Sequence, residues 1–195
     1  MDTSADGRRG CTHDSMSVFS ECRLVVLLAD YAVADAGGKL NILGAGFTIS
    51  GIQPTGLIGP QYVAVMIDVP AKFVGQEFPL SLELKDETTG MTVTLPGPTG
   101  EPDALRIQQF VKAEPPHIAG VYLPSSLWSR VQLVMGFPNG LPLQPGGIYH
   151  WRAEIEGQHR AGWSAHFHVA GPPPPTVVGG PANAGDIDDL PSAED

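Results

Sequence analysis

Hydrophobic and polar residues alternate with a period of two along much of the chain, most clearly between residues 147 and 170. Every second residue is apolar from 149 to 155, and the same alternation resumes after a turn near 157–160. Successive side chains of a strand point to opposite faces, so this pattern is typical of two half-buried antiparallel strands. The residues predicted to face inward are Tyr149, Trp151, Ala153, Ile155, Ala161, Trp163, Ala165, Phe167 and Val169.

Similar segments recur along the chain and are separated by turns rich in glycine, proline and aspartate. They lie near residues 23–31, 39–49, 61–69, 80–86, 91–95, 104–112, 128–137, 147–156 and 161–170. No segment shows the apolar period of a long helix. Short strands at regular spacing predict an all-β domain, and we expect an antiparallel β-sandwich, Ig-like or jelly-roll-like, of about eight or nine strands.

The two ends of the chain differ from this middle in composition. Residues 1–20 are polar and aperiodic, and residues 172–195 are rich in proline, glycine and acidic side chains. Segments of such composition bury too little apolar surface to offset the entropy of ordering. We therefore expect a disordered leader over 1–20, one sandwich domain over 21–171 and a disordered acidic tail over 172–195.

The charge balance excludes some classes of partner. The chain has 195 residues with 21 acidic and 11 basic side chains, for a formal net charge of −10. Nucleic acids and anionic membranes are bound by basic surfaces, so we expect neither as a partner. The longest apolar run, residues 24–29, is too short to cross a membrane, and no signal peptide is recognisable. We expect a cytoplasmic or virion-associated protein.

Cys11 and Cys22 are the only cysteines in the sequence. A disulfide between them stays possible, but two thiols do not make the disulfide framework of a small secreted domain. We interpret them as free thiols in a reducing compartment. Neither has a recognisable histidine partner that would activate it as a nucleophile.

Three histidines give the strongest hint of chemistry. His150, His166 and His168 occupy polar positions of the last two predicted strands, so they share the outward face of one hairpin. If the inward residues of the two strands match, His150 lies directly or diagonally opposite His166 or His168, with Cβ atoms about 4.5–8 Å apart. Three imidazoles in that arrangement could bind zinc, nickel or iron.

The same segment resembles the cupin motifs in part. Residues 145–150 fit the P-x-G-x-x-H portion of the second cupin motif, and residues 166–168 resemble the H-x-H of the first. The two pieces occur in the wrong order, no glutamate follows His168 at the expected spacing, and Glu154 replaces an asparagine. We favour the simpler interpretation of a Pro-Gly-x-Tyr strand opener with polar residues on a solvated sheet face, and keep a metal site as the alternative.

Other candidates have simpler explanations. Asp30 and Asp35 flank the first turn, and Asp68 lies on the polar side of its strand. Carboxylates could serve acid–base chemistry or calcium, but at strand ends they usually accept hydrogen bonds from turn amides. The aromatic residues Trp128, Trp151 and Trp163 are predicted to be core residues rather than a ligand platform.

Two short motifs support a resemblance. The residues Leu-Ala-Asp-Tyr-Ala at 28–32 are followed by Gly-Lys-Leu-Asn-Ile-Leu-Gly at 38–44. This combination resembles the opening hairpin of a family of actinobacterial and phage proteins of unknown function, over about residues 20–170. The resemblance implies a single β-sandwich that closes on a Pro-Gly-x-Tyr strand, and it implies no activity. It makes a phage-associated role plausible.

These observations favour a non-enzymatic module for binding or assembly. We expect a protein partner or self-association, and a virion accessory or decoration role is the leading specific interpretation. The alternative is a cupin-like metal-binding enzyme that uses His150, His166 and His168, with no other cofactor expected. A third hypothesis is carbohydrate binding through an exposed tryptophan.

Overall fold

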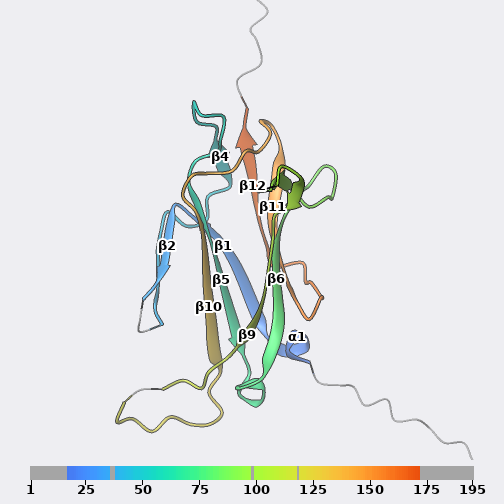
Figure 1. Cartoon of the computed structure of the whole chain (residues 1–195). Helices are drawn as coiled ribbons and strands as arrows, with labels where there is room; N and C mark the ends of the chain where they lie inside the picture. The colour runs from blue at the N-terminus through green and yellow to red at the C-terminus, as the bar shows by residue number, and fades with distance from the viewer. Residues whose placement is uncertain (1–16, 36–37, 98, 118, 172–195) are drawn as a thin grey trace, which may run out of the picture.

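The computed structural model describes residues 17–35, 38–97, 99–117 and 119–171, and it shows an all-β sandwich (Figure 1). A three-stranded sheet of order β1-β5-β10 packs against a five-stranded sheet of order β4-β12-β11-β6-β9. The predicted all-β sandwich is therefore confirmed. The predictions for residues 1–16 and 172–195 lie outside the described residues. No helix in the described ranges is long and apolar enough to cross a membrane.

In the described part of the chain, twelve strands and two short helices make up this fold. The elements are α1 Val18–Glu21, β1 Arg23–Ala29, β2 Tyr31–Ala34, β3 Leu40–Leu43, β4 Ile49–Gly51, β5 Gln61–Val69, the 3-10 helix η1 Ala71–Phe73, β6 Glu77–Asp86, β7 Thr94–Pro96, β8 Pro102–Ala104, β9 Arg106–Lys112, β10 Ser129–Phe137, β11 Ile148–Ile155 and β12 Ser164–Ala170. Two hairpins lie outside the main sheets. β2 and β3 form one of them, and β7 and β8 form the other.

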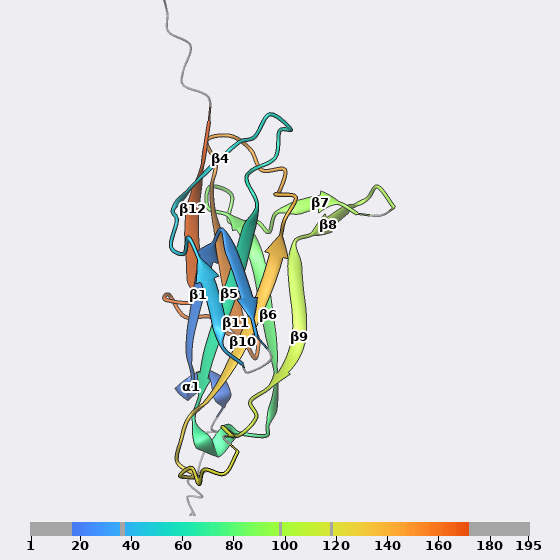
Figure 2. The same ribbon diagram turned by 90° about the vertical axis from the view of Figure 1, so that its left-hand side faces the viewer.

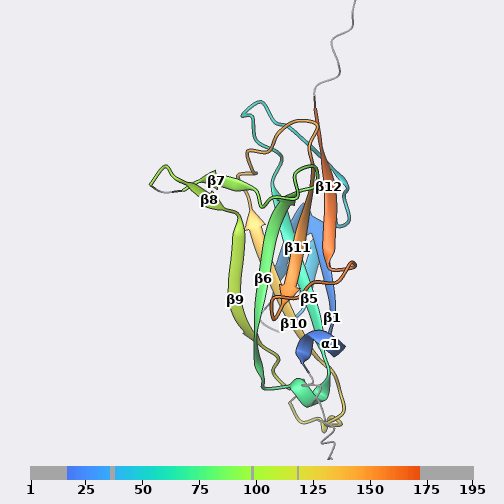
Figure 3. The same ribbon diagram turned by 90° about the vertical axis from the view of Figure 1, so that its right-hand side faces the viewer.

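The views from the two sides show what covers each sheet. The β2–β3 hairpin lies over the outer face of β1-β5-β10 (Figure 2), where Ala32 of the hairpin forms a small buried cluster with Ala29 and Ala64 of the sheet. The small side chains let the hairpin backbone approach the sheet closely. The outer face of β12, β11, β6 and β9 is the side seen in Figure 3. It carries mainly polar and charged residues.

The core between the sheets follows the period-two pattern. Residues 149, 151, 153 and 155 of β11 and 163, 167 and 169 beside or in β12 are all buried. Trp151 is fully buried and stacks on Phe137 of the opposite sheet, with ring centroids 5.1 Å apart. Replacing a buried tryptophan by alanine costs about 3–5 kcal/mol, so this contact contributes strongly to sheet packing.

Two predicted strands are each divided in the structure, and β8 is an additional strand before β9, so the strand number exceeds the expected eight or nine. The segment 23–31 bends at Asp30, and the segment 39–49 is interrupted at residues 44–48. The Asp30 N–H donates to Leu43 O at 3.1 Å, and the Asp30 carboxylate occupies the space that a Cβ atom on Gly44 would need. Gly44 also has a φ of +65°, which favours glycine. Both motifs at 28–44 thus have a structural role in turning the hairpin away from β1.

The predicted start of the domain at residue 21 falls inside α1. Val18 of this helix is fully buried in the main core, and the ring of Phe19 meets Trp163 edge-on at 5.3 Å. The helix therefore caps one end of the sandwich. Polar residues around it hid this short apolar segment from the sequence pattern.

Gly140 offers a test of how the loops at the other end are fixed. Its φ is +74°, and a Cβ atom added there would collide with the carbonyl oxygen of Ile58. Gly56 has a similar φ of +80° but faces open space. An alanine in the left-handed region costs about 1–2 kcal/mol, so Gly56→Ala should destabilise by about that amount. Gly140→Ala should cost roughly 3 kcal/mol or more, because the clash adds to the strain.

The two variants are compared by urea unfolding of the full chain. Equal losses for Gly140→Ala and Gly56→Ala would show that the loop containing Ile58 does not pack closely against Gly140.

Candidate functional site

His150 and His166 lie directly opposite each other on the outer face of the five-stranded sheet. The pair Ala153–Trp163 is hydrogen bonded, with Ala153 N–H donating to Trp163 O at 2.9 Å. Bonded and non-bonded pairs alternate in an antiparallel ladder, so the pair 150–166 is of the non-hydrogen-bonded type, in which side chains are closest. The two imidazole rings are nearly parallel, with centroids 4.8 Å apart and an interplanar angle of 26°.

Glu87 joins this pair from the end of β6. Its backbone N–H donates to Ile148 O at 2.9 Å, which continues the pairing of β6 with β11 by one residue. Its Oε2 atom lies 2.6 Å from Nδ1 of His150 and 3.5 Å from Nδ1 of His166. Asp86 holds the turn that follows, because its Oδ1 accepts the N–H groups of Thr88 and Thr89 at 2.8 and 3.0 Å.

His168 lies outside this cluster. It lies two residues after His166 on β12, where it pairs with Ile148 on β11 and with Ile49 on β4. The structure therefore brings together two of the three histidines that the sequence indicated and adds Glu87. The sequence pattern missed Glu87 because the pairing of β6 with β11 joins residues far apart in the chain, such as Asp86 and Tyr149, and no local period encodes it.

The environment of His150 favours its neutral form. Burial lowers the pKa of His150, and His166 and Lys85 lower it further, while Glu87 acts in the opposite direction. The Nδ1 atom of His150 is buried and has no well-aligned hydrogen-bond partner, even though the Glu87 carboxylate is close. A neutral imidazole nitrogen beside a carboxylate oxygen is a donor set that suits a metal cation.

The cupin-like segment at 145–150 has a structural explanation. The ring of Tyr149 folds back over Gly147 and leaves no room there for a Cβ atom. Its hydroxyl accepts the backbone N–H of Gln144 at 3.0 Å. Gly146 has a φ of +80°, which a glycine adopts without strain. The Pro-Gly-Gly-Ile-Tyr segment at 145–149 thus opens β11, as the simpler interpretation predicts.

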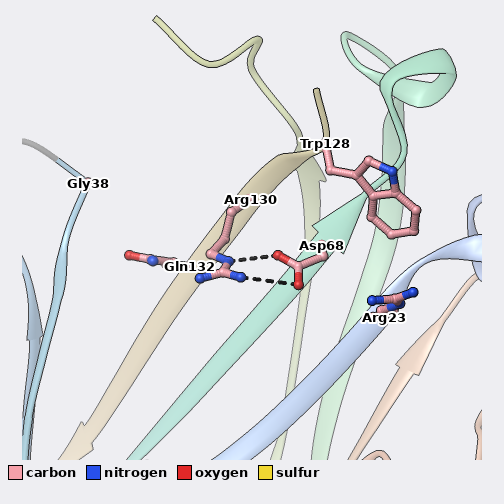
Figure 4. Close-up of a pocket in the computed structure, with 6 residues that line it drawn as sticks. All are labelled: Arg23, Gly38, Asp68, Trp128, Arg130 and Gln132. Carbon is pink, nitrogen blue, oxygen red and sulfur yellow. Dashed lines mark hydrogen bonds and ion pairs between the residues drawn. The ribbon is translucent and has the colours of Figure 1, made fainter. Parts of the chain in front are cut away.

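A second cluster lies on the outer face of the three-stranded sheet. Arg23, Asp68 and Arg130 are in register across β1, β5 and β10, so they form one row (Figure 4). Arg130 donates two hydrogen bonds to Asp68, from Nε to Oδ1 at 2.7 Å and from Nη2 to Oδ2 at 3.2 Å. The bond to Asp68 raises the pKa of Arg130, so its guanidinium stays charged.

Trp128 and Gln132 complete a pocket around this row. The guanidinium carbon of Arg23 lies 5.1 Å from the centre of the Trp128 ring, which is a cation–π distance. The pocket has a volume of about 680 Å³. The Oε1 atom of Gln132 is buried in it without a hydrogen-bond partner. Trp128 is 44% exposed, so its prediction as a core residue is wrong, whereas the burial predicted for Trp151 and Trp163 is confirmed.

The acidic candidates do not form a second site. Asp35 accepts the Lys39 N–H at 2.9 Å, which is the turn role that its position predicted. Asp68 is held by Arg130, and Asp30 lies against Gly44. Within the described residues, the only group of three possible metal ligands close to one another is Glu87, His150 and His166.

Cys22 is a free thiol, and it is buried beneath α1. Burial raises the pKa of Cys22 to about 11, although the nearby Arg160 guanidinium opposes the shift. A thiol with this pKa is protonated at neutral pH and is a poor nucleophile. Cys11 lies outside the described residues. The structure therefore gives Cys22 a packing role rather than a catalytic one.

Comparison with known proteins gives no match: no protein-family model and no curated protein matches this chain. The resemblance of the 28–44 hairpin to a family of phage and actinobacterial proteins stays a prediction. Functional inference rests on the two outer faces of the sandwich.

The reactivity of Cys22 can be measured in a Cys11→Ser background, where it is the only thiol. At pH 8 a thiol of pKa about 11 is ionised in roughly one molecule in a thousand, so labelling by Ellman's reagent should be at least about 100-fold slower than in the urea-unfolded chain. Rates within tenfold of each other would show that α1 does not shield this residue.

Proposed function

We propose that this protein is a non-enzymatic β-sandwich binding module that docks a partner protein on the outer side of β1-β5-β10. The observation that supports this proposal is the distribution of exposed apolar side chains. Eight of the twelve large apolar residues that are exposed in the described ranges belong to β1, the β2–β3 hairpin and the loop leading into β10. They are Val25, Tyr31, Val33, Leu43, Val121, Tyr122, Leu127 and Trp128.

The β2–β3 hairpin is apolar on both of its faces. Ala32 and Ile42 face the sheet and pack on it, while Val33 and Leu43 lie on the other face of the hairpin and are exposed. Tyr31 is 48% exposed, and one edge of it meets the Tyr62 ring of β5 with ring centroids 5.2 Å apart. A hairpin that only covered the sheet would gain from polar residues on its outer face. In Figure 1 this hairpin and the loop before β10 lie on the same side of the molecule. We name this side, made of the eight residues given above, the docking face.

The pocket gives the docking face its anchor. It combines the indole of Trp128 with the guanidinium groups of Arg23 and Arg130, and Asp68 neutralises one of these charges. Within the described residues Arg23 forms no salt bridge. Tryptophan, tyrosine and arginine are the residues most enriched at energetic hot spots of protein interfaces. The matching partner segment carries a carboxylate beside an aromatic or aliphatic side chain.

Extent and charge favour a protein over a small ligand. Exposed apolar residues lie on β1, the β2–β3 hairpin and the loop before β10 as well as in the pocket, which is more than one small molecule would contact. Large exposed apolar surfaces mark protein interaction sites. The pocket is basic, whereas the whole chain has a net charge of −10. An acidic partner segment is therefore attracted to the pocket and repelled by the rest of the protein.

We extend the proposal to a narrower role, that of a virion accessory or decoration protein. The support is the resemblance of residues 28–44 to a family found in phage genomes. Those residues build the β2–β3 hairpin, which contributes three of the eight side chains of the docking face.

The proposal is tested by selecting a displayed random-peptide library on the immobilised full-length chain. We expect enriched peptides with Asp or Glu next to an aromatic or aliphatic residue. Binding of a synthetic copy of such a peptide should weaken at least tenfold, about 1.4 kcal/mol, in Trp128→Ala and in Arg23→Glu. The first variant removes the indole of the pocket, and the second replaces a positive charge by a negative one. Isothermal titration calorimetry gives the dissociation constants.

Phe110→Ala is the matched control, since Phe110 is 75% exposed on β9 of the other sheet and should leave binding within twofold. Peptides that bind the pocket variants as well as the wild type would contradict the proposal. Binding of glycans instead of peptides, lost in Trp128→Ala, would replace it with carbohydrate recognition. If light scattering shows a mass that rises with protein concentration and this rise is lost in Trp128→Ala, the docking face binds a second copy of the chain instead of a partner protein.

A further inference from the structure

The polar face of the five-stranded sheet holds a site that the docking proposal does not use. The ligand atoms of Glu87, His150 and His166 all lie within 4.8 Å of one another. We propose that these three residues bind one divalent transition-metal ion. This site lies on the sheet opposite to the docking face, so either proposal stands without the other.

The distances fit a metal ion after a small movement. Ligand atoms about 2.0–2.1 Å from a tetrahedral zinc ion lie roughly 3.4 Å from one another. The two contacts of Glu87 Oε2, at 2.6 and 3.5 Å, already bracket this value. His166 and Glu87 are about half exposed, so rotation of their side chains can bring the remaining ligand pair to this spacing without disturbing the core.

The backbone holds all three ligands in place. His150 and His166 are fixed by the register of β11 and β12, and Glu87 is fixed to β11 by its hydrogen bond to Ile148. Two adjacent strands and the turn after β6 therefore contribute one ligand each. The backbone positions of the ligands are fixed before an ion binds, so only side-chain rotation has to be restricted on binding.

The one basic side chain paired with His150 is held by other groups, so it does not prevent a cation from binding. Lys85 is the residue of β6 that pairs with His150, and its ammonium would repel an ion placed there. Its Nζ atom instead lies 3.3 Å from Glu83 Oε1 and 3.4 Å from Gly90 O. The Nδ1 atom of His150 is buried without an aligned partner, and a metal ion between it and Glu87 would satisfy both groups.

The ligand set indicates which ions the site would take. Two imidazole nitrogens and one carboxylate oxygen suit zinc, cobalt, nickel and copper, and they suit calcium or magnesium poorly because those ions prefer oxygen ligands. With three protein ligands, at least one coordination position stays open to water.

The site is tested on the full-length chain expressed without a histidine tag. Zn²⁺ is titrated by calorimetry, and Co²⁺ is titrated by visible absorption, which reports tetrahedral coordination. We expect one ion per chain, with affinity reduced at least about tenfold in each of His150→Gln, His166→Gln and Glu87→Gln. At the same concentration, Zn²⁺ should also raise the melting temperature of the wild type more than that of each of the three variants.

His168→Gln is the matched control because His168 lies on the same strand and the same face as His166. This variant should bind Zn²⁺ with an affinity within twofold of that of the wild type. Circular dichroism confirms that each variant is folded. Wild-type binding no stronger than that of a variant carrying all three substitutions would overturn the proposal. A loss in His168→Gln with none in Glu87→Gln would overturn it in favour of a three-histidine site.

Discussion

The stacking of Trp151 on Phe137 joins the two sheets of this sandwich, and the rest of the structure depends on it. Trp151 is central to β11, and Phe137 ends β10 on the opposite sheet, with ring centroids 5.1 Å apart. Side chains of a strand alternate between faces, so burying Trp151 commits His150 and Arg152 to the outer face. A slip of one residue would expose the indole and bury an imidazole, which fixes the register strongly.

The same alternation divides the molecular surface into two unlike halves. On the five-stranded sheet it places imidazoles, carboxylates and guanidinium groups in rows, with Glu87 and His150 at one end. On the three-stranded sheet it leaves a row of two arginines and one aspartate, beside an exposed tryptophan and an apolar hairpin. One half offers ligands for a cation, and the other offers an interface for a protein. No shared residue links them among those described, so each can be changed without the other.

The local pattern predicted most of the fold and only part of the sites. Alternation identified the inward residues of β11 and β12, and matching the hairpin placed His150 directly or diagonally opposite His166 or His168, of which the structure pairs it with His166. It failed where non-local contacts decide. Glu87 reaches the histidines through the pairing of β6 with β11, and Asp30 and Gly44 divide two strands through a contact across the hairpin. Trp128 precedes β10 at the sheet end, where nothing covers it fully, although its type suggested a core residue.

The register of β11 and β12 places both the buried Trp151 and the outward histidines, and nuclear Overhauser effects between Hα protons measure it directly. Non-hydrogen-bonded pairs of an antiparallel ladder bring their Hα protons closest. The structure therefore predicts a strong Hα–Hα cross-peak between His150 and His166, with a second between Arg152 and Ser164. A cross-peak between His150 and His168 in place of the first would show a register shifted by two residues and would contradict the pairing of His150 with His166.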